Sequence, residues 1–370
     1  MQNREHYSTW VEIDLKIIEA NARCLRSWMG NELMAMIKAN GYGHGAVPAA
    51  RAALKGGASW LGVARIEEAV EVRQAGLDCP VLILGYTPPA RLEEAIAGDI
   101  SMAVWNREQL EAVSAAAVRT GRPARLHLKV DTGMSRLGVQ PQEALDLAHQ
   151  VAGARGVVFE GLFTHFARAD EPDAESNMAQ ERLFDSLLDG LDGAGLRPQL
   201  VHAANSAAAL TRPHARLDMV RIGISLYGLN PSCECPNPAE IRPALAWKSV
   251  LSQVKTLPPG RGVSYGHEYV TRGNEIIGTV PVGYGDGYRR ASGNTVLVSG
   301  QRVPVVGRVA MDQLMVRLDG LPQAKPGDEV ILIGSQGDTC LSADDVAHAW
   351  GTINYEVVCA IGPRVPRIYT

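Results

Sequence analysis

Two lysines, two arginines and a histidine lie at or just after the ends of short apolar segments, and together they could bind an anion. Lys38 ends the segment LMAMIK, Lys129 lies in RLHLKV, and Arg221 lies in MVRIG. Arg136 follows in the loop DTGMSRLG, and His165 ends VVFEGLFTH. A protein interior does not accommodate so many cations without anionic partners, because an unpaired buried charge is costly. These residues indicate an anionic ligand, and a phosphate group is the natural candidate.

A second set of residues could hold that phosphate. Asn205 and Ser206 lie in HAANSAA, where Ser206 could begin a short helix and offer its hydroxyl and backbone N–H groups. Gly223 lets the backbone approach a ligand closely, and Tyr42 could add its hydroxyl. A buried lysine such as Lys38 is an amine suited to forming a Schiff base. A Schiff-base lysine beside a phosphate site suggests pyridoxal 5'-phosphate (PLP) as the cofactor.

Each charged residue alone has a simpler explanation. Lys38 could lay its aliphatic stem along the segment end with its amine in water. His165 could be a hydrogen-bonded core histidine, and Lys129 could form only a structural pair with Asp131. The joint occurrence of these residues at successive segment ends is what favours a site.

Such a site requires a scaffold that brings the ends of several segments together. Between residues 33 and 224, apolar runs of strand length alternate with Ala- and Glu-rich stretches of helical period, such as 66–76, 107–120 and 180–195. An α/β fold with a (β/α)8 TIM-type barrel is predicted, with its chemistry at the carboxyl ends of the strands. An open doubly wound sheet is the alternative, but no GxGxxG follows the first strand. The expected strands are 33–38, 60–64, 81–85, 101–105, 125–130, 157–165, 199–204 and 219–223.

The pattern changes after the proline-rich stretch NPSCECPNPAEIRP at 230–243. The runs that follow are rich in β-forming residues and are cut by Gly, Pro and Asp, which predicts a mostly β domain. We expect a PLP-binding α/β barrel domain at 1–235 and a C-terminal β domain at 236–370. A strand expected at Trp10–Asp14 precedes the barrel and could join the β domain.

Composition argues against several other classes of protein. The formal net charge of -4 and the lack of a long basic run argue against nucleic acid as a partner. No apolar run has the length of a bilayer span, and the start MQNREHYSTW lacks a secretory signal, so we expect a cytoplasmic protein with no membrane partner. The cysteines are scattered, and Cys233 and Cys235 lack a second Cys or His cluster, so we expect no disulfide framework and no metal site.

Further motifs extend over nearly the whole chain. They are AMIKANGYGHG, LKVDTGMSRLG, THFARAD, HAANSAA, VRIGISLYG, VSYGHEY, PVGYGDGYRR, RVAMDQ, INYEV and RVPRIY. In this order they resemble the motifs of the alanine racemase family, PLP enzymes with a barrel and a C-terminal β domain. The resemblance implies PLP-dependent interconversion of L-alanine and D-alanine, which serves peptidoglycan synthesis or D-alanine catabolism.

The resemblance also implies two bases. Lys38 would bind PLP covalently and act as one base, and Tyr265 in VSYG would act on the opposite face of the substrate. Racemisation removes a proton from one face and returns one to the other, so one base is needed on each. Tyrosine is a weak base with an unperturbed pKa of ~10, and His165 or Arg290 would assist it.

Other residues would bind the cofactor and the substrate. Arg221 would face the pyridine nitrogen, and Arg136 with Met311 would hold the substrate carboxylate. Lys129, as a carbamate, would position Arg136, and Asp312 follows Met311 in the entrance loop. In the family the β domain contributes to the partner's active site, so we expect a homodimer with shared active sites. The implied cofactor-binding set is Lys38, Tyr42, Asn205, Ser206, Arg221, Gly223, Ile224 and Tyr355.

Other functions on a similar scaffold stay open. A racemase of serine or lysine, or a PLP-dependent decarboxylase, would share the fold, although the VSYG and MDQ motifs argue against a decarboxylase. A non-catalytic PLP carrier would lack the β domain that contains Tyr265. A class I aldolase barrel also uses a Schiff-base lysine, but usually on its sixth strand.

Overall fold

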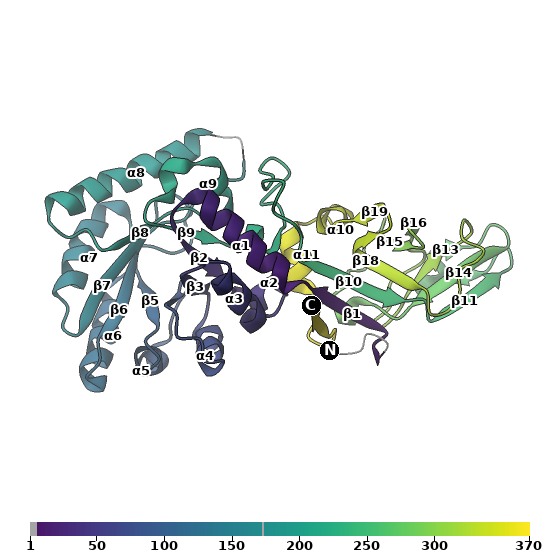
Figure 1. The fold of residues 1–370 in the computed structure, drawn as a ribbon, viewed down its shortest axis with the longest axis horizontal. Coiled ribbons are helices and arrows are strands. Elements are labelled where there is room, and N and C mark those ends of the chain that lie inside the picture. The colour runs from purple at the N-terminus through teal and green to yellow at the C-terminus, as the bar shows by residue number, and fades with distance from the viewer. Residues whose placement is uncertain (1–5, 172–173) are drawn as a thin grey trace. The chain divides into compact units, whose positions relative to one another are not determined.

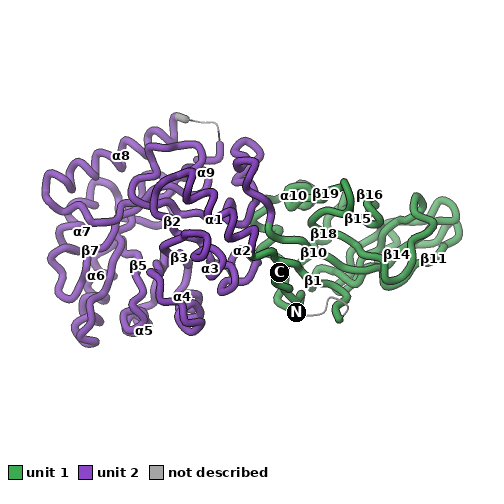
Figure 2. Tube along the Cα trace, in the orientation of Figure 1, with its two compact units in different colours: residues 1–15, 244–370 green, residues 16–243 purple. Residues whose placement is uncertain are grey.

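The computed structural model describes residues 6–171 and 174–370. The chain forms two compact units, one of residues 16–243 and one of residues 1–15 with 244–370 (Figure 2). The first five residues, part of the stretch in which we expect no secretory signal, lie outside the described residues. No described helix has both the length and the apolar character needed to cross a membrane.

The unit of residues 16–243, here called the barrel unit, is built around one parallel sheet. Its strands follow the order β8-β7-β6-β5-β4-β3-β2-β9 (Figure 1), and each expected strand is present. Asp218 N–H donates to Val201 O at 3.1 Å and Arg221 N–H to Ala204 O at 3.0 Å, which joins β8 to β9 and closes the sheet. The predicted barrel is confirmed. The strands are β2 (Glu32–Met36), β3 (Trp60–Val63), β4 (Val81–Ile83), β5 (Ser101–Val104), β6 (Ala124–Lys129), β7 (Val157–Phe163), β8 (Leu200–His202) and β9 (Met219–Ile222).

Helices line the outside of this sheet (Figure 1), so the strands are buried on both faces and read as near-continuous apolar runs. The helix expected at 180–195 begins earlier, at Ala174. Residues 174–179 contain neither glycine nor proline, and Glu175 in the first turn suits a helix start. The helices are α1 (Leu15–Met29), α2 (Lys38–Tyr42), α3 (Ala46–Lys55), α4 (Ile66–Gln74), α5 (Leu92–Ala97), α6 (Arg107–Thr120), α7 (Pro141–Gly153), α8 (Ala174–Gly193) and α9 (Ser206–Thr211).

The second unit, here called the β unit, is mostly strand, as predicted. Its main sheet contains β1 (Thr9–Ile13), β10 (Leu245–Val250), β15 (Thr295–Val298), β16 (Gln301–Pro304), β18 (Glu329–Gln336), β19 (Thr339–Leu341) and β20 (Arg367–Tyr369). β1 pairs antiparallel with β10 and parallel with β20, so the described start of the chain belongs to this sheet.

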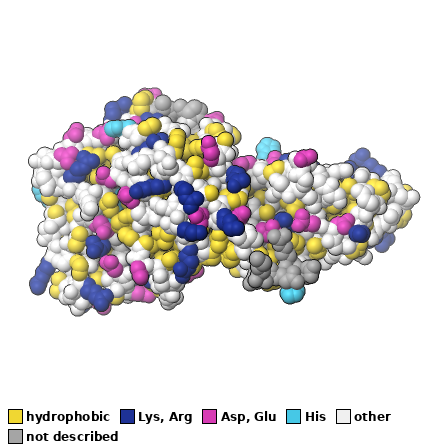
Figure 3. Space-filling view, viewed as in Figure 1, with side chains coloured by type: hydrophobic (Ala, Val, Ile, Leu, Met, Phe, Trp, Pro, Cys, Tyr) yellow, Lys and Arg dark blue, Asp and Glu magenta, His cyan; other side chains and the backbone are white. Residues whose placement is uncertain are grey.

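The described remainder of the β unit includes two small sheets and two α-helices. They are β11 (Gln253–Leu257), β14 (Glu275–Val280) and β17 (Leu314–Arg317), the hairpin β12 (Gly262–Val263) with β13 (Tyr269–Val270), and the helices α10 (Ala343–Trp350) and α11 (Asn354–Ala360). On the face seen in Figure 3, basic and acidic side chains are interspersed, so the charge of this surface is mixed in sign.

Candidate active site

Lys38 begins a strained turn at the carboxyl end of β2. Ala39, Asn40 and Tyr42 have φ of 52°, 53° and 52°, and Gly41 between them has φ of 60°. Non-glycine residues rarely adopt this left-handed conformation. Three of them in one turn require a surrounding structure that offsets the conformational free energy cost. Strain of this kind concentrates at functional sites, and the carboxyl ends of barrel strands are where such sites form.

Side chains from two elements hold this turn. Asn40 Oδ1 accepts the Ala46 N–H at 2.9 Å, which ties the turn to the start of α3. Glu68 of α4 accepts the Ala39 N–H through Oε1 at 2.6 Å and the Ala64 N–H through Oε2 at 2.7 Å. One carboxylate thus joins the ends of β2 and β3 and fixes the backbone directly after the lysine.

Three polar groups next to this turn form a cradle. A Cβ at Gly223 would lie 2.5 Å from Tyr42 Oη, so only glycine fits beneath the phenol. The Gly223 N–H donates to Ser206 Oγ at 2.9 Å. Lys38 Nζ lies 5.9 Å from the centre of the Tyr42 ring. The structure therefore brings Lys38, Tyr42, Ser206 and Gly223 together, although they come from three separate strand ends.

Two short helices start at this cradle. Asn205 caps α9 by accepting the Ala208 N–H at 2.9 Å, so Ser206 is the first helical residue. Ile224 begins the short 3-10 helix η4 (Ile224–Tyr227) directly after Gly223. The backbone N–H groups at a helix start favour anions.

Arg221 of β9 is buried inside the barrel unit. Its guanidinium donates to the carbonyl oxygens of Thr164 at 2.9 Å and Ala203 at 2.8 Å. It also contacts His202 Nδ1 at 3.0 Å and His165 Nδ1 at 3.1 Å. All of these partners are neutral acceptors, and burial lowers the pKa of Arg221 to about 9. The guanidinium is thus fixed in place and still charged at neutral pH.

Lys129 and His165 share this cationic environment. Burial, followed by the charges of Arg221 and Arg136, lowers the pKa of Lys129 to about 8, against an opposing effect of Asp131. Burial and the same cations hold the pKa of His165 well below its usual value. His165 is therefore neutral, and Lys129 has more uncharged amine at neutral pH than a free lysine has.

The other expected site residues belong to the β unit. Tyr265 begins the 3-10 turn η5 (Tyr265–His267) after Ser264, which has φ of 61°, and its side chain is 71% exposed. Arg290 is exposed and close enough to Glu268, the residue after η5, to lower the pKa of that carboxylate, after the larger effect of Arg308. Tyr355 is a half-buried residue of α11.

Met311 and Asp312 lie in a loop that the β unit holds in place. The Gly285 N–H donates to Met311 O at 2.9 Å, and Arg364 pairs with Asp312 at 2.8 Å. A Cβ at Gly283 would lie 2.2 Å from Ala310 O, so the close approach of the Gly283 backbone to this loop depends on glycine. The Met311 side chain is nevertheless exposed.

Two family models match the chain. Residues 13–231 match the alanine racemase N-terminal domain and residues 244–369 match the alanine racemase C-terminal domain. Matches to both domain models, together with the relatives described next, place the chain among the isomerases that act on amino acids. The chain belongs to the alanine racemase family.

Relatives are similar over their whole lengths. The alanine racemase of Desulfovibrio desulfuricans is 48% identical over 97% of both chains, and that of Symbiobacterium thermophilum is 47% identical over 98% of this chain and 97% of its own. Among solved structures, alanine racemase from Streptomyces lavendulae is 43% identical with a TM-score of 0.94 and covers 98% of this chain and 97% of its own. The E. faecalis alanine racemase is 41% identical with a TM-score of 0.93 over 100% of both chains.

Sequence reasoning missed three residues that shape the site. Glu68 holds the Lys38 turn, and His127 and Glu160 extend the hydrogen bonds of Arg221 through His202. The available signal was a polar residue inside a buried strand, because His127 stands between two leucines in RLHLKV.

Proposed function

We propose that the protein interconverts L-alanine and D-alanine with PLP held at the carboxyl end of the barrel. The observation that carries this proposal is the cradle of Tyr42, Ser206 and Gly223 beside Lys38, because a Cβ at position 223 would fill it. Membership of the alanine racemase family supports the substrate.

The described residues fit PLP. In this proposal, Tyr42, Ser206, Gly223 and Ile224 bind the phosphate, Asn205 keeps the start of α9 in place for it, and Tyr355 of the β unit completes the set. Lys38 binds the cofactor covalently, and Arg221 faces the pyridine nitrogen. PLP, when bound, supplies an electron sink that makes the α-proton of an amino acid acidic.

Lys38 and Tyr265 act as the two bases in this proposal. The amine of Lys38 takes or returns the α-proton on one face of the substrate, and the phenol oxygen of Tyr265 does so on the other. His165 supports the tyrosine: its Nδ1 accepts from Arg221, so the neutral ring carries its proton on Nε2 and can donate. Arg290, in the same unit as Tyr265, is the second residue proposed to assist the tyrosine.

The substrate carboxylate binds Arg136, with Met311 beside it, and Asp312 lies at the entrance. Lys129 carries a carbamate, an anion that pairs with Arg136 and holds it in place. The lowered pKa of Lys129, caused first by its burial, supports this modification because carbon dioxide reacts with the uncharged amine. Tyr265 and Met311 are exposed, and we propose that they serve the site of a second copy in a homodimer.

The proposal is tested by measuring conversion of L-alanine to D-alanine by the PLP-loaded protein, with the reverse reaction measured as well. Lys38→Ala should abolish turnover and the visible absorption of lysine-bound PLP. Serine and lysine as alternative substrates test the other racemases, and carbon dioxide release tests a decarboxylase. Failure of the PLP-loaded protein to racemise alanine would contradict the proposal. The product would supply peptidoglycan synthesis, or the reverse reaction would serve D-alanine degradation.

A further inference from the structure

A line of hydrogen bonds runs from Arg221 through the barrel core. Arg221 Nη1 lies 3.0 Å from His202 Nδ1, and His202 Nε2 lies 2.9 Å from His127 Nδ1. His127 Nε2 lies 3.2 Å from Glu160 Oε2. His127 and His202 are fully buried, and Arg221 is nearly so. We call these four residues the relay.

The direction of every hydrogen bond in the relay follows from its first member. A guanidinium has only donors, so His202 Nδ1 accepts from Arg221. Burial is the first cause that lowers the pKa of both His202 and His127, so both rings are neutral. A neutral His202 then carries its proton on Nε2 and donates to His127 Nδ1. His127 in turn donates from Nε2 to the Glu160 carboxylate, so every donor points away from Arg221.

The backbone is built to bring Glu160 to this place. Leu126 of β6 pairs with Phe159 of β7, but the next residue, His127, pairs with Gly161. Glu160 is the extra residue of a β-bulge, a device that redirects a side chain. A Cβ at Gly161 would lie 2.3 Å from His127 Nδ1, so glycine is required for the ring to occupy its position.

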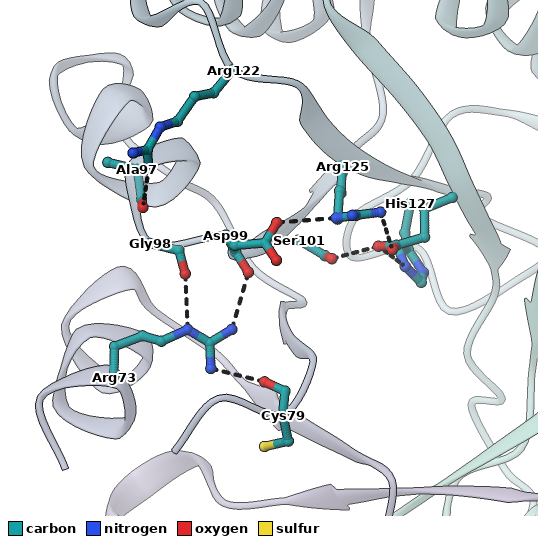
Figure 4. A network of polar contacts seen from close by, with 10 residues as sticks. Arg73, Cys79, Ala97, Gly98, Asp99, Ser101, Arg122, Arg125 and His127 are labelled. Carbon is teal, nitrogen blue, oxygen red and sulfur yellow. Dashed lines mark hydrogen bonds and ion pairs between the residues drawn. The ribbon is translucent and has the colours of Figure 1, made fainter. Parts of the chain in front are cut away.

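Other contacts keep Glu160 ionised. Burial opposes ionisation, but hydrogen bonds from His127 and Ser101 hold the pKa of Glu160 below its usual value. Arg125 lies 3.3 Å from Glu160 Oε1 and pairs further out with Asp99 at 3.0 Å. Arg125 and His127 both contact the Glu160 carboxylate. Figure 4 shows Asp99 beside Arg125, on the side away from His127.

We propose that Glu160 is a positioning residue of the active site, which acts through His127 and His202 to keep an acceptor nitrogen facing Arg221. Without the carboxylate, His127 loses the acceptor of its Nε2–H. The relay can then reverse, so that His127 donates from Nδ1 to His202 Nε2. A reversed relay places an N–H of His202 against the guanidinium, and two facing donors displace Arg221.

Nitrogen-15 NMR of the histidine rings in the cofactor-free protein tests the relay. The signals of each ring are assigned from a variant in which that one histidine is replaced. In the wild-type protein, both His127 and His202 should carry the proton on Nε2 alone. Glu160→Leu should shift His202 toward the Nδ1–H tautomer. Glu160→Gln should keep the wild-type tautomers because its amide oxygen can still accept. Asp99→Asn is the matched control, since Asp99 contacts Arg125 and should leave both tautomers unchanged.

A second arm uses the PLP-loaded protein and rests on the proposed function, because it takes Arg221 as the residue facing the pyridine nitrogen. Glu160→Leu should lower kcat by about 10-fold, a loss typical of residues that orient a functional side chain. It should also change the PLP absorption spectrum, with little effect on KM for alanine. Glu160→Gln should restore most of kcat.

The outcomes separate the two proposals. Racemisation failing in the wild-type protein contradicts the proposed function, while the tautomers still report on the relay. An Nδ1–H tautomer or a doubly protonated ring in the wild-type protein overturns the relay, even if Glu160→Leu does not fold. Wild-type tautomers and spectrum in Glu160→Leu, with only a lower melting temperature, would make Glu160 merely structural.

Discussion

The barrel unit and the β unit differ in how they present their share of the proposed site. Arg221 and Lys129 of the barrel unit are 2% and 6% exposed, and the guanidinium of Arg221 is fixed by several acceptors. Tyr265 and Met311 of the β unit are 71% and 53% exposed. Of these proposed site residues, the barrel unit thus buries Arg221 and Lys129, whereas the β unit exposes a tyrosine and a methionine.

This difference suggests that the two units have different roles in the proposed site. Residues fixed from several sides suit cofactor binding, which requires preorganised contacts. Large exposed apolar side chains suit a surface that a second copy covers. Tyr284 and Ile353 of the β unit are also about half exposed, at 49% and 58%. On this interpretation, a substitution in the barrel unit should inactivate the site of its own subunit. A substitution in the β unit should inactivate the site of the partner subunit.

The largest expected effect comes from splitting the two bases between subunits. Lys38→Ala and Tyr265→Ala homodimers should each lose activity by about 10²–10⁴-fold or more, the contribution of a positioned base. Unfolding the two variants together and refolding the mixture should restore about a quarter of wild-type activity, because half of the dimers are mixed and each has one intact site. Steady-state racemisation before and after mixing measures this.

Two variants that damage the same unit provide the control for mixing. Lys38→Ala mixed with Gly223→Ala should give only the average of the two variants' own activities, since both residues belong to the barrel unit and mixing repairs neither site. If Tyr265 served the site of its own chain, mixing Lys38→Ala with Tyr265→Ala would restore no activity. A mixed dimer of these two variants without activity would therefore contradict the shared site.

The next largest effect is expected at the cradle. Gly223→Ala brings a methyl group to within 2.5 Å of Tyr42 Oη and forces the phenol away. We expect PLP affinity, measured by titration of cofactor-free protein, to fall by about 10-fold, which corresponds to about 1.4 kcal/mol. Gly153→Ala is the matched control, because no atom lies within 4 Å of that Cβ. Unchanged PLP affinity in Gly223→Ala would remove the cradle from the proposed cofactor site.

Much of the barrel could be predicted from the sequence because strands buried on both faces must be apolar throughout. Polar residues at the ends of such runs, such as Lys38 and Arg221, therefore stand out and indicate a site. The mostly β nature of the second unit was also visible in its short runs separated by Gly, Pro and Asp. Family motifs supplied the expected role of Tyr265, which no local pattern would have revealed.

Contacts that depend on register could not be predicted in the same way. Simple alternation along VVFEGLF gives no reason to direct Glu160 toward His127, and the bulge that does so is visible only in the paired strands. Glu68 looks like an ordinary first-turn acidic residue of α4, yet it holds the turn after Lys38. The left-handed conformation of Ala39 likewise depends on these contacts, because alanine has no local preference for it.

A smaller effect is expected from the carbamate proposed at Lys129. Burial comes first among the causes that lower its pKa to about 8, so the amine is mostly protonated below that pH and uncharged above it. Only the uncharged amine adds carbon dioxide. The mass of the bicarbonate-treated protein should therefore show more of the adduct as the pH rises from about 7 to about 9, and kcat/KM should rise by about 3-fold with it.

Lys129→Arg is the control for this adduct, since a guanidinium does not form the carbamate. An adduct of equal abundance in Lys129→Arg would place the modification elsewhere. A carbamate yield independent of pH across this range would contradict the role assigned to the lowered pKa.

The smallest effect is expected in the β unit, at the ion pairs that hold the loop of Met311 and Asp312. Arg364 pairs with Asp286 at 2.7 Å and with Asp312 at 2.8 Å, and its own side chain is 46% exposed. The pair with Asp312 is exposed at both ends, and such pairs contribute about 0–1 kcal/mol. Asp286 is buried but keeps the Gly283 N–H as a donor, so Arg364→Ala should raise KM for alanine by only about 2-fold and leave kcat unchanged. Arg302→Ala, which removes a similarly exposed ion pair with Asp345, should change neither constant. A large fall in kcat would mean that this loop is preorganised like the barrel, and the contrast between the two units would then not hold for their loops.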